Sequence, residues 1–114
     1  MILIADDNRE MRETLKDILR EFDPYFCECS NGNEVVELYR THHPDWVLMD
    51  VMMPFIDGIA ATRRIKDLFP DARILIVTNY NDPLLRHEAK QAGAVGFVLK
   101  DDLSVLATIM GQFS

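Results

Sequence analysis

Short apolar runs alternate with segments of helical spacing along the whole chain. The apolar runs predict five strands, at residues 2–5, 25–29, 46–49, 73–77 and 95–99. Between and after them, apolar residues recur three or four positions apart, which is typical of amphipathic helices. These segments predict five helices, at residues 8–22, 33–42, 59–69, 82–92 and 103–113.

The apolar positions also predict which side of each helix faces the core. The first helix places five apolar residues on one face: Met11, Leu15, Ile18, Leu19 and Phe22. The second helix does the same with Val36, Leu38 and Tyr39. The fourth helix has clear end signals, since Asp82 is a good N-cap, Pro83 suits the first helical position and Gly93 suits the C-terminal stop.

Strict alternation of strands and helices favours an α/β fold with a parallel sheet covered on both faces. Residues 47–49 and 74–77 are continuously apolar, as expected of central strands buried on both sides. The sequence therefore predicts three layers, with helices on either side of a five-stranded sheet.

Polar residues follow the apolar runs at the predicted strand ends. Strand one ends in Asp6 and Asp7, strand three in Asp50, strand four in Thr78 and strand five in Lys100. Because sites in open parallel sheets form at the carboxyl ends of the strands, we expect these side chains to meet. Asp50 is the most informative, since a carboxylate inside so apolar a run is costly unless it is used or paired.

Such a cluster suits phosphoryl chemistry. Crowded carboxylates repel one another, and Mg²⁺ resolves that repulsion by taking oxygen ligands from carboxylates, water and phosphate. An aspartate can then attack phosphorus and carry an acyl phosphate. Lys100 supplies a fixed positive charge and Thr78 a hydroxyl donor for phosphoryl oxygens.

Composition narrows the function classes. The 114 residues fit a single domain, residues 1–114, and the net charge of −7 makes it a poor binder of nucleic acids and anionic membranes. No run is long enough for a membrane helix, and no signal peptide is expected at the N-terminus. Cys27 and Cys29 are expected to be reduced, and the protein cytoplasmic. His42, His43 and His87 are expected on the surface.

Together these residues resemble the receiver domain of two-component response regulators over essentially the whole chain. The matching motifs are Ile4-Ala5-Asp6-Asp7-Asn8, Leu48-Met49-Asp50-Val51-Met52-Met53-Pro54, Asp57-Gly58, Val77-Thr78 and Gly96-Phe97-Val98-Leu99-Lys100. The stretch from Asp57 to Arg63 looks most like the NarL/FixJ class, whose receivers usually precede a DNA-binding domain. The resemblance implies a doubly wound, flavodoxin-like (CheY-like) fold with strand order 2-1-3-4-5.

The resemblance also implies a role for each matching residue. Asp50 is the phosphoacceptor, Lys100 contacts a phosphoryl oxygen, and Thr78 and Phe97 form the switch, with Phe97 turning inward when Thr78 moves. The Mg²⁺ ligands are Asp7 and Asp50, the backbone carbonyl of Met52, and Asp6 through water. Met52 and Tyr80 occupy the positions that tune dephosphorylation, where their bulk suggests a long-lived phosphoryl group.

The implied function is a signalling switch phosphorylated by a histidine kinase. The implied partners are that kinase and a second copy bound through the helix 4–strand 5–helix 5 face, with DNA reached only through an output domain outside this chain. Three alternatives stay open: a stand-alone receiver acting by protein–protein interaction, a non-phosphorylated interaction module, and an aspartate-nucleophile phosphatase. The phosphatase is disfavoured, because Met52 stands where such enzymes carry a second aspartate, so no turnover enzyme is expected.

Overall fold

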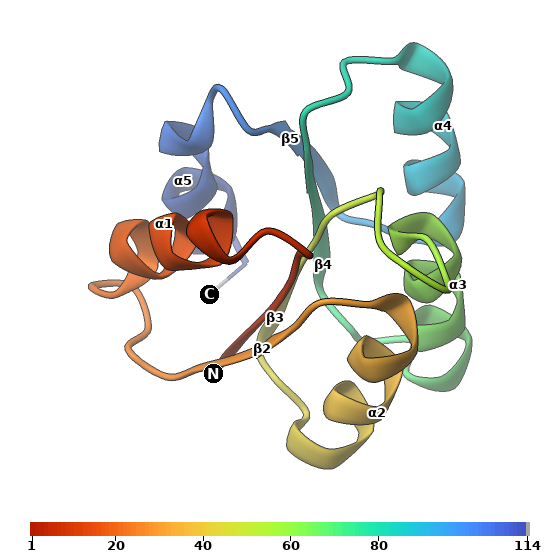
Figure 1. Ribbon diagram of the computed structural model, residues 1–114, viewed down its shortest axis with the longest axis horizontal. Coiled ribbons are helices and arrows are strands. Elements are labelled where there is room, and N and C mark those ends of the chain that lie inside the picture. Colours follow the sequence, from red (N-terminus) through yellow and green to blue (C-terminus); the bar gives the residue numbers. More distant parts are fainter. Residues whose placement is uncertain (114) are drawn as a thin grey trace.

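The computed structural model describes residues 1–113 of the chain (Figure 1). Its elements, in order, are β1 (Ile2–Ala5), α1 (Arg9–Leu19), β2 (Phe26–Cys29), α2 (Gly32–His42), β3 (Trp46–Met49), α3 (Gly58–Leu68), β4 (Ile74–Thr78), α4 (Pro83–Ala92), β5 (Gly96–Leu99), a 3₁₀ turn η1 (Leu103–Val105) and α5 (Leu106–Gly111). The predicted alternation is confirmed, and most predicted boundaries differ by no more than one residue.

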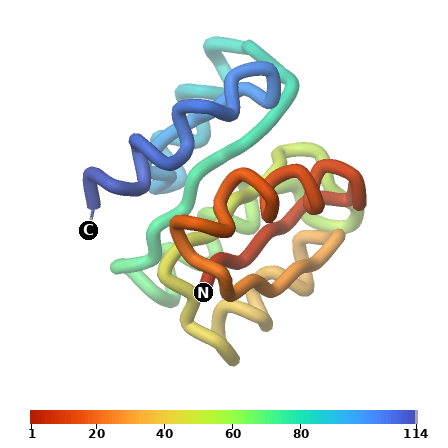
Figure 2. Tube along the Cα trace, turned by 90° about the vertical axis from the view of Figure 1, so that its left-hand side faces the viewer, coloured from red at the N-terminus to blue at the C-terminus, as the bar shows by residue number. Residues whose placement is uncertain are grey.

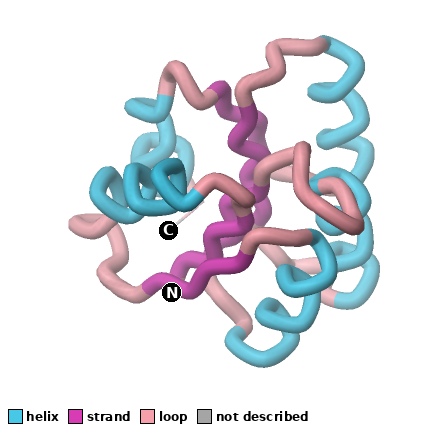
Figure 3. Tube along the Cα trace, viewed as in Figure 1, coloured by secondary structure: helices cyan, strands magenta, loops and turns pink. Residues whose placement is uncertain are grey.

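The strands form one parallel sheet in the order β2-β1-β3-β4-β5, as predicted (Figure 3). β1 lies between β2 and β3 with Ala5 level with both Cys29 and Met49. β1, β3 and β4 are fully buried along their lengths, which agrees with the continuously apolar runs. The carboxyl ends of β1 and β3 are therefore side by side at one edge of the sheet.

Helices cover both faces of the sheet and enclose two cores. α1 and α5 lie on one face, while α2, α3 and α4 lie on the other (Figure 1). Figure 2 shows the α1 and α5 face turned toward the reader. Alternate residues of each strand enter opposite cores: in β1, Ile2 and Ile4 pack with Leu15 and Leu19, whereas Leu3 packs in the other core.

Polar side chains cap four of the helices. The side chains of Asn8, Asn31, Asp57 and Asp82 accept hydrogen bonds from backbone amides in the first turns of α1, α2, α3 and α4. The end signals predicted for α4 are confirmed, since Pro83 opens it and Gly93 ends it with φ +104°.

Two predicted helices are too long. α1 ends at Leu19 instead of residue 22, because the amides of Phe22 and Asp23 both bond to the Leu19 carbonyl and turn the chain away. Ile18 and Phe22 are consequently 41% and 40% exposed and do not enter the core. The segment 103–113 begins as a 3₁₀ turn, η1, and is α-helical only from Leu106 to Gly111.

The face of α2 is also shifted from the prediction. Val35, Val36 and Tyr39 are its buried apolar side chains, whereas Leu38 is only half-buried. A short helix with several neighbouring apolar residues leaves the inward direction ambiguous, and packing against α3 decides it.

The single tryptophan lies at the opposite end of β3 from Asp50. The ring of Trp46 meets that of Phe113 edge-on, with centroids 5.3 Å apart. The Arg73 guanidinium lies 5.8 Å from the centroid of each ring. Through these contacts, Phe113, which follows α5, packs against the amino-terminal end of the sheet.

The histidines lie on the surface, as the sequence predicts, and the two cysteines lie on β2. Both cysteines are free thiols, and burial raises the pKa of Cys29 to about 12. His42, His43 and His87 are exposed, although His43 also contacts the rings of Tyr39 and Phe69. None of the helices in residues 1–113 is both long enough and apolar enough to cross a bilayer.

Candidate functional site

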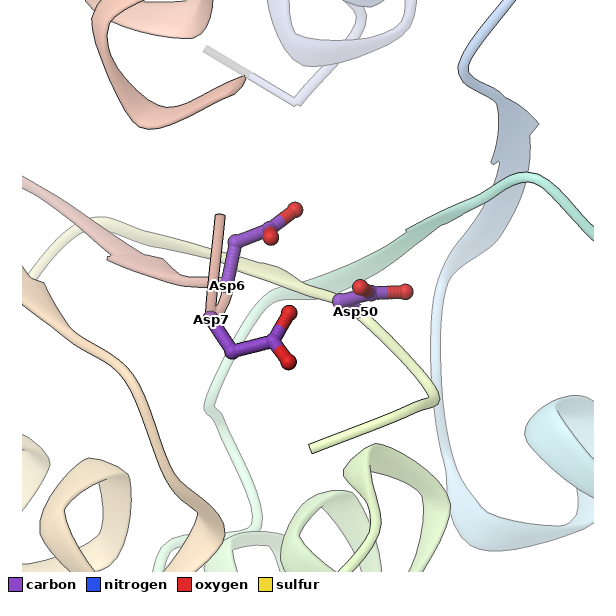
Figure 4. Close-up of side chains that lie close together, drawn as sticks. All are labelled: Asp6, Asp7 and Asp50. Atoms are coloured by element: carbon purple, nitrogen blue, oxygen red, sulfur yellow. The ribbon is translucent and has the colours of Figure 1, made fainter. Parts of the chain in front are cut away.

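Three carboxylates meet where β1 and β3 end. Asp6 and Asp7 follow β1, Asp50 follows β3, and the amide of Asp50 bonds to the carbonyl of Ala5 at 2.9 Å. Each of the three offers an oxygen within 4.8 Å of the others. In Figure 4, Asp6 and Asp7 direct their carboxyl groups to the side on which Asp50 lies. The fold therefore brings these three residues together, as the sequence predicts.

Lys100 bridges two of the three carboxylates. Its ammonium nitrogen lies 2.8 Å from an oxygen of Asp6 and 3.1 Å from an oxygen of Asp50. All three side chains are at most 8% exposed. With all groups ionised, three carboxylates and one ammonium leave the cluster with a formal charge of −2.

The surroundings shift two pKa values in the cluster. Burial raises the pKa of the Asp50 carboxyl, and the nearby Asp6 raises it further, which together outweigh the opposite effect of Lys100. Burial lowers the pKa of Lys100, but its contacts with Asp6 and Asp50 more than reverse this and leave it raised. The lysine is therefore firmly cationic, whereas ionised Asp50 is held at an energetic cost.

Asp6 is fixed from several directions. One of its carboxylate oxygens accepts from the amide of Asn8 at 2.8 Å, and the other contacts Lys100. Its backbone carbonyl accepts from the Arg12 guanidinium at 2.7 Å. Asp7, in contrast, is exposed, and its carboxylate forms no hydrogen bond or ion pair within residues 1–113.

This donor set fits a hard divalent cation. Carboxylate oxygens grouped within a few ångströms, with one exposed member free to coordinate, match the oxygen ligands and retained waters that Mg²⁺ prefers. The Asp6 carboxylate already has partners at both oxygens, so Asp7 and Asp50 are the better-placed direct ligands.

Thr78 and Phe97 lie on the same face of the sheet. Ile76 is level with Phe97, and Thr78 is level with Leu99, so alternation places Thr78, Ile76 and Phe97 on the α3 and α4 side. Thr78 is fully buried, and its hydroxyl accepts from the amide of Tyr80 at 3.4 Å. Among the described residues Thr78 has no hydrogen bond to Asp50, so the structure brings it beside the cluster without joining it.

The β3–α3 loop, residues 50–57, forms one side of the site. Met52 is exposed in this loop, and Tyr80 is exposed after β4. The amide of Ile56 bonds to the Pro54 carbonyl, which makes a γ-turn centred on Phe55. Phe55 has φ +71° and is 85% exposed, an unusual combination for a large apolar residue.

Gly58 and Gly32 hold this loop against the rest of the fold. A Cβ at Gly58 would overlap the carbonyl oxygen of Asp50, and its amide bonds to the Val51 carbonyl at 2.8 Å. A Cβ at Gly32, the first residue of α2, would overlap the carbonyl oxygen of Ile56. Both glycines therefore permit the close backbone approach that fixes the position of Asp50.

Sequence reasoning missed the roles of Arg12 and Gly58. The sequence marks Gly58 only as part of the Asp57-Gly58 motif, and the structure adds that Asp57 caps α3. Arg12 carries no sequence signal, because its contact with the Asp6 carbonyl depends on how α1 packs beside β1. The glycine eight residues after Asp50, at the start of the next helix, is a signal that could have indicated a close approach.

Comparisons with known proteins agree with this geometry. The family described as response regulator receiver domain matches residues 2–110. Chemotaxis protein CheY of Halobacterium salinarum is 39% identical over 99 residues, which are 87% of this chain and 82% of that protein. Transcriptional regulatory protein LnrK of Bacillus subtilis is 37% identical over 102 residues, 88% of this chain but only 46% of that protein.

A solved structure matches over nearly the full length. In the CheX–CheY–BeF₃–Mg²⁺ complex from Borrelia burgdorferi, the matching chain has a TM-score of 0.89 and 28% identity, covering 99% of this chain and 88% of that one.

Proposed function

Since this chain belongs to the response regulator receiver domain family of two-component systems, we propose that Asp50 accepts a phosphoryl group from a histidine kinase and that the domain switches state as a result. The observation that carries this is the grouping of three carboxylates within 4.8 Å, two of them bridged by the buried Lys100. A carboxylate nucleophile, fixed positive charge and a hard-cation site are the components that phosphoryl transfer to aspartate needs.

Asp50 is the proposed nucleophile. Its backbone is fixed by the Ala5 carbonyl and by the close approach of Gly58, so its carboxylate is held at the mouth of the cluster. As its oxygen bonds to phosphorus, the bond from phosphorus to the donor's imidazole nitrogen breaks. Lys100 then exchanges its contact with the Asp50 oxygen for one with a phosphoryl oxygen.

Mg²⁺ is the proposed cofactor. Asp7, Asp50 and the backbone carbonyl of Met52 would hold it directly, and Asp6 would hold it through water. When bound, the ion supplies positive charge that offsets the carboxylates and the phosphoryl oxygens. The protein's own part is to keep Asp6 oriented through Asn8 and Lys100.

The proposed output is a shift between two conformations. The Thr78 hydroxyl, which has only a long contact with the Tyr80 amide, is free to turn toward a phosphoryl oxygen on Asp50. Space vacated by Thr78 lies on the sheet face that also carries Phe97, so Phe97 can turn inward. The α4–β5–α5 face then changes its shape, and a second copy of the chain or an output domain reads that change.

The biological setting is proposed from the relatives. LnrK is a transcriptional regulator more than twice as long as the matched region, which makes a DNA-binding output domain the favoured context. CheY relatives, of which this chain covers about four fifths, make a stand-alone receiver the second candidate. Because the chain modifies its own aspartate, we propose that it is not a turnover enzyme on external substrates.

The test is intact mass after incubation with acetyl phosphate, with and without Mg²⁺, on the parent and Asp50→Ala. The expected result is a gain of one phosphoryl group that requires Mg²⁺ and is absent from the variant. No gain in the parent under either condition would overturn the proposal and leave an unphosphorylated interaction module. A gain that persists in Asp50→Ala would assign the chemistry to another residue.

A further inference from the structure

Arg86 of α4 lies directly over Phe97 of β5. The guanidinium carbon is 4.5 Å from the centroid of the Phe97 ring, well within the range of a cation–π contact. Phe97 is half-buried, whereas Arg86 is exposed. The arginine therefore covers one side of the aromatic ring while its own charge remains in water.

Phe97 also packs against the core on the α3 and α4 side of the sheet, but α4 itself confines the ring little. The buried side chains of α4 are only Ala89 and Ala92, which are too small to confine an aromatic group. A cavity of about 260 Å³ lies between α4 and β5, and its lining includes Arg86, Ala89, Gly96 and Phe97. Since close packing is what normally fixes a core rotamer, a ring beside an open cavity has alternatives.

The cation on Arg86 is available to the ring. Within residues 1–113 the side chain of Arg86 has no carboxylate within 4 Å, and the group it contacts is the Phe97 ring. Asp82 contacts Arg86 only through the backbone, where its carbonyl accepts from the Arg86 amide. Because no carboxylate competes for the guanidinium, its charge can interact fully with the ring.

We propose that Arg86 is a positioning residue that holds Phe97 over the α4–β5 cavity and so opposes its inward turn. The inference rests on the proposed switch, in which the inward position of Phe97 accompanies phosphorylation of Asp50. Arg86 then sets how rarely the unphosphorylated domain occupies the active arrangement. It acts through Phe97 and touches neither Asp50 nor the other carboxylates.

The direct test uses the full chain labelled with 4-fluorophenylalanine. Its six phenylalanines give six ¹⁹F resonances, and that of Phe97 is identified by its loss in Phe97→Leu. In Arg86→Gln, the inward population of the free protein is expected to rise about two- to fivefold, the factor that an exposed cation–π contact supplies. Arg86→Lys, which keeps the cation, is expected to remain close to the parent.

A second measurement follows the equilibrium between the two positions of Phe97 through the phosphorylation of Asp50. Because the inward arrangement is the phosphorylation-competent one in this proposal, a larger inward fraction of the free protein is expected to raise the rate of phosphorylation by acetyl phosphate in Arg86→Gln by a similar factor. The effect is expected to vanish in the Phe97→Leu background, where there is no ring for the cation to hold. A purely structural role for Arg86 would change folding stability in both backgrounds equally.

The outcomes separate this inference from the proposed function. An unchanged Phe97 resonance in free Arg86→Gln overturns the inference, whatever happens at Asp50. An equal effect of Arg86→Gln with and without Phe97 also overturns it. Failure of the parent to gain a phosphoryl group overturns the proposed function, while the ¹⁹F comparison of the free proteins still decides the role of Arg86.

Discussion

The ammonium group of Lys100 and the carboxylate of Asp50 lie 3.1 Å apart, although fifty positions separate them in the chain. Both are nearly inaccessible to water, and Lys100 holds Asp6 at the same time. A buried ion pair contributes little more to stability than an apolar pair of similar size. Removing one partner is nevertheless costly, because the other charge stays buried without compensation. The metal-free domain therefore depends on Lys100 to tolerate the negative charge of its acidic cluster.

Replacing Lys100 by Met is expected to destabilise the metal-free protein by about 3 kcal/mol, because two buried carboxylates lose their partner. The measurement is urea unfolding in EDTA at neutral pH. Lys16→Met is the matched control, since Lys16 also bridges two carboxylates, Glu13 and Glu28, at the surface. There the expected loss is much smaller, because ion pairs at the surface contribute little to stability. Equal losses would contradict the prediction.

Asp50→Asn is expected to stabilise the metal-free protein at pH 7. The folded state raises the pKa of Asp50, so its favourable contribution is present below the unfolded pKa and is lost as pH rises through the folded pKa. Asn carries no such charge, so we expect the variant to have the higher free energy of unfolding at pH 7. The exposed Glu21→Gln serves as control.

The difference in stability between the parent and Asp50→Asn should depend on both pH and Mg²⁺. The advantage of Asp50→Asn should shrink as pH falls through the raised pKa of Asp50 in the folded state, where the parent carboxyl takes up its proton. Added Mg²⁺ should stabilise the parent more than the variant, because a bound ion favours the state that holds it. An advantage that is independent of both pH and Mg²⁺ would point to packing as its cause.

Gly58→Ala is expected to cost about 2–3 kcal/mol and to slow phosphorylation, because the new methyl group displaces the Asp50 backbone. Gly111→Ala is a matched control, since a Cβ there meets nothing within 4 Å. The control should be neutral or slightly stabilising, as Ala favours a helix over Gly. Thermal unfolding and acetyl phosphate kinetics measure the two effects. A Gly58→Ala protein as stable and reactive as the parent would refute the close approach.

Phe55→Gly is expected to stabilise the protein by about 0.5–1 kcal/mol, whereas the nearby Gly58→Ala is expected to destabilise it. Glycine adopts φ +71° without the left-handed penalty, and the exposed phenylalanine ring loses little burial. Phe55→Ala separates the causes, because alanine keeps the backbone penalty and should give no gain. Equal stabilisation by both substitutions would assign the effect to the exposed ring.

Met52→Asn and Tyr80→Ala are expected to shorten the life of the phosphoryl group, each by about two- to tenfold. Both side chains are exposed on segments that follow β3 and β4, where their bulk would restrict the approach of water to Asp50. Loss of the phosphorylated mass over time measures the decay. Leu68→Ala, an exposed apolar residue at the end of α3, is the control. Decay no faster than in the parent would remove the tuning role.

The sequence was most informative where chemistry adjoins a strand end. Asp6, Asp7, Asp50 and Lys100 could be placed in one site because parallel strands must bring their carboxyl ends to one edge. That argument requires only the order of the strands, not the details of packing. The family resemblance then supplied the strand order, which the structure confirms.

The features that sequence reasoning missed all depend on tertiary packing. Ile18 and Phe22 continue the apolar spacing of α1, but the turn after Leu19 leaves them largely exposed. The cation–π contact of Arg86 with Phe97 joins two elements whose approach has no local signal. Local periodicity predicts elements, whereas their mutual distances arise only in the folded chain.

The position of Trp46 determines what its fluorescence can report. Asp50 is four residues further along the same strand direction, about 13 Å away at roughly 3.3 Å per residue. The indole instead contacts Phe113 and Arg73, at the end of the sheet remote from the acidic cluster. Intrinsic emission should therefore follow the docking of the chain after α5 and stay silent when Asp50 is modified. A fluorescent readout of phosphorylation in this protein requires an indole introduced at the other end of the sheet.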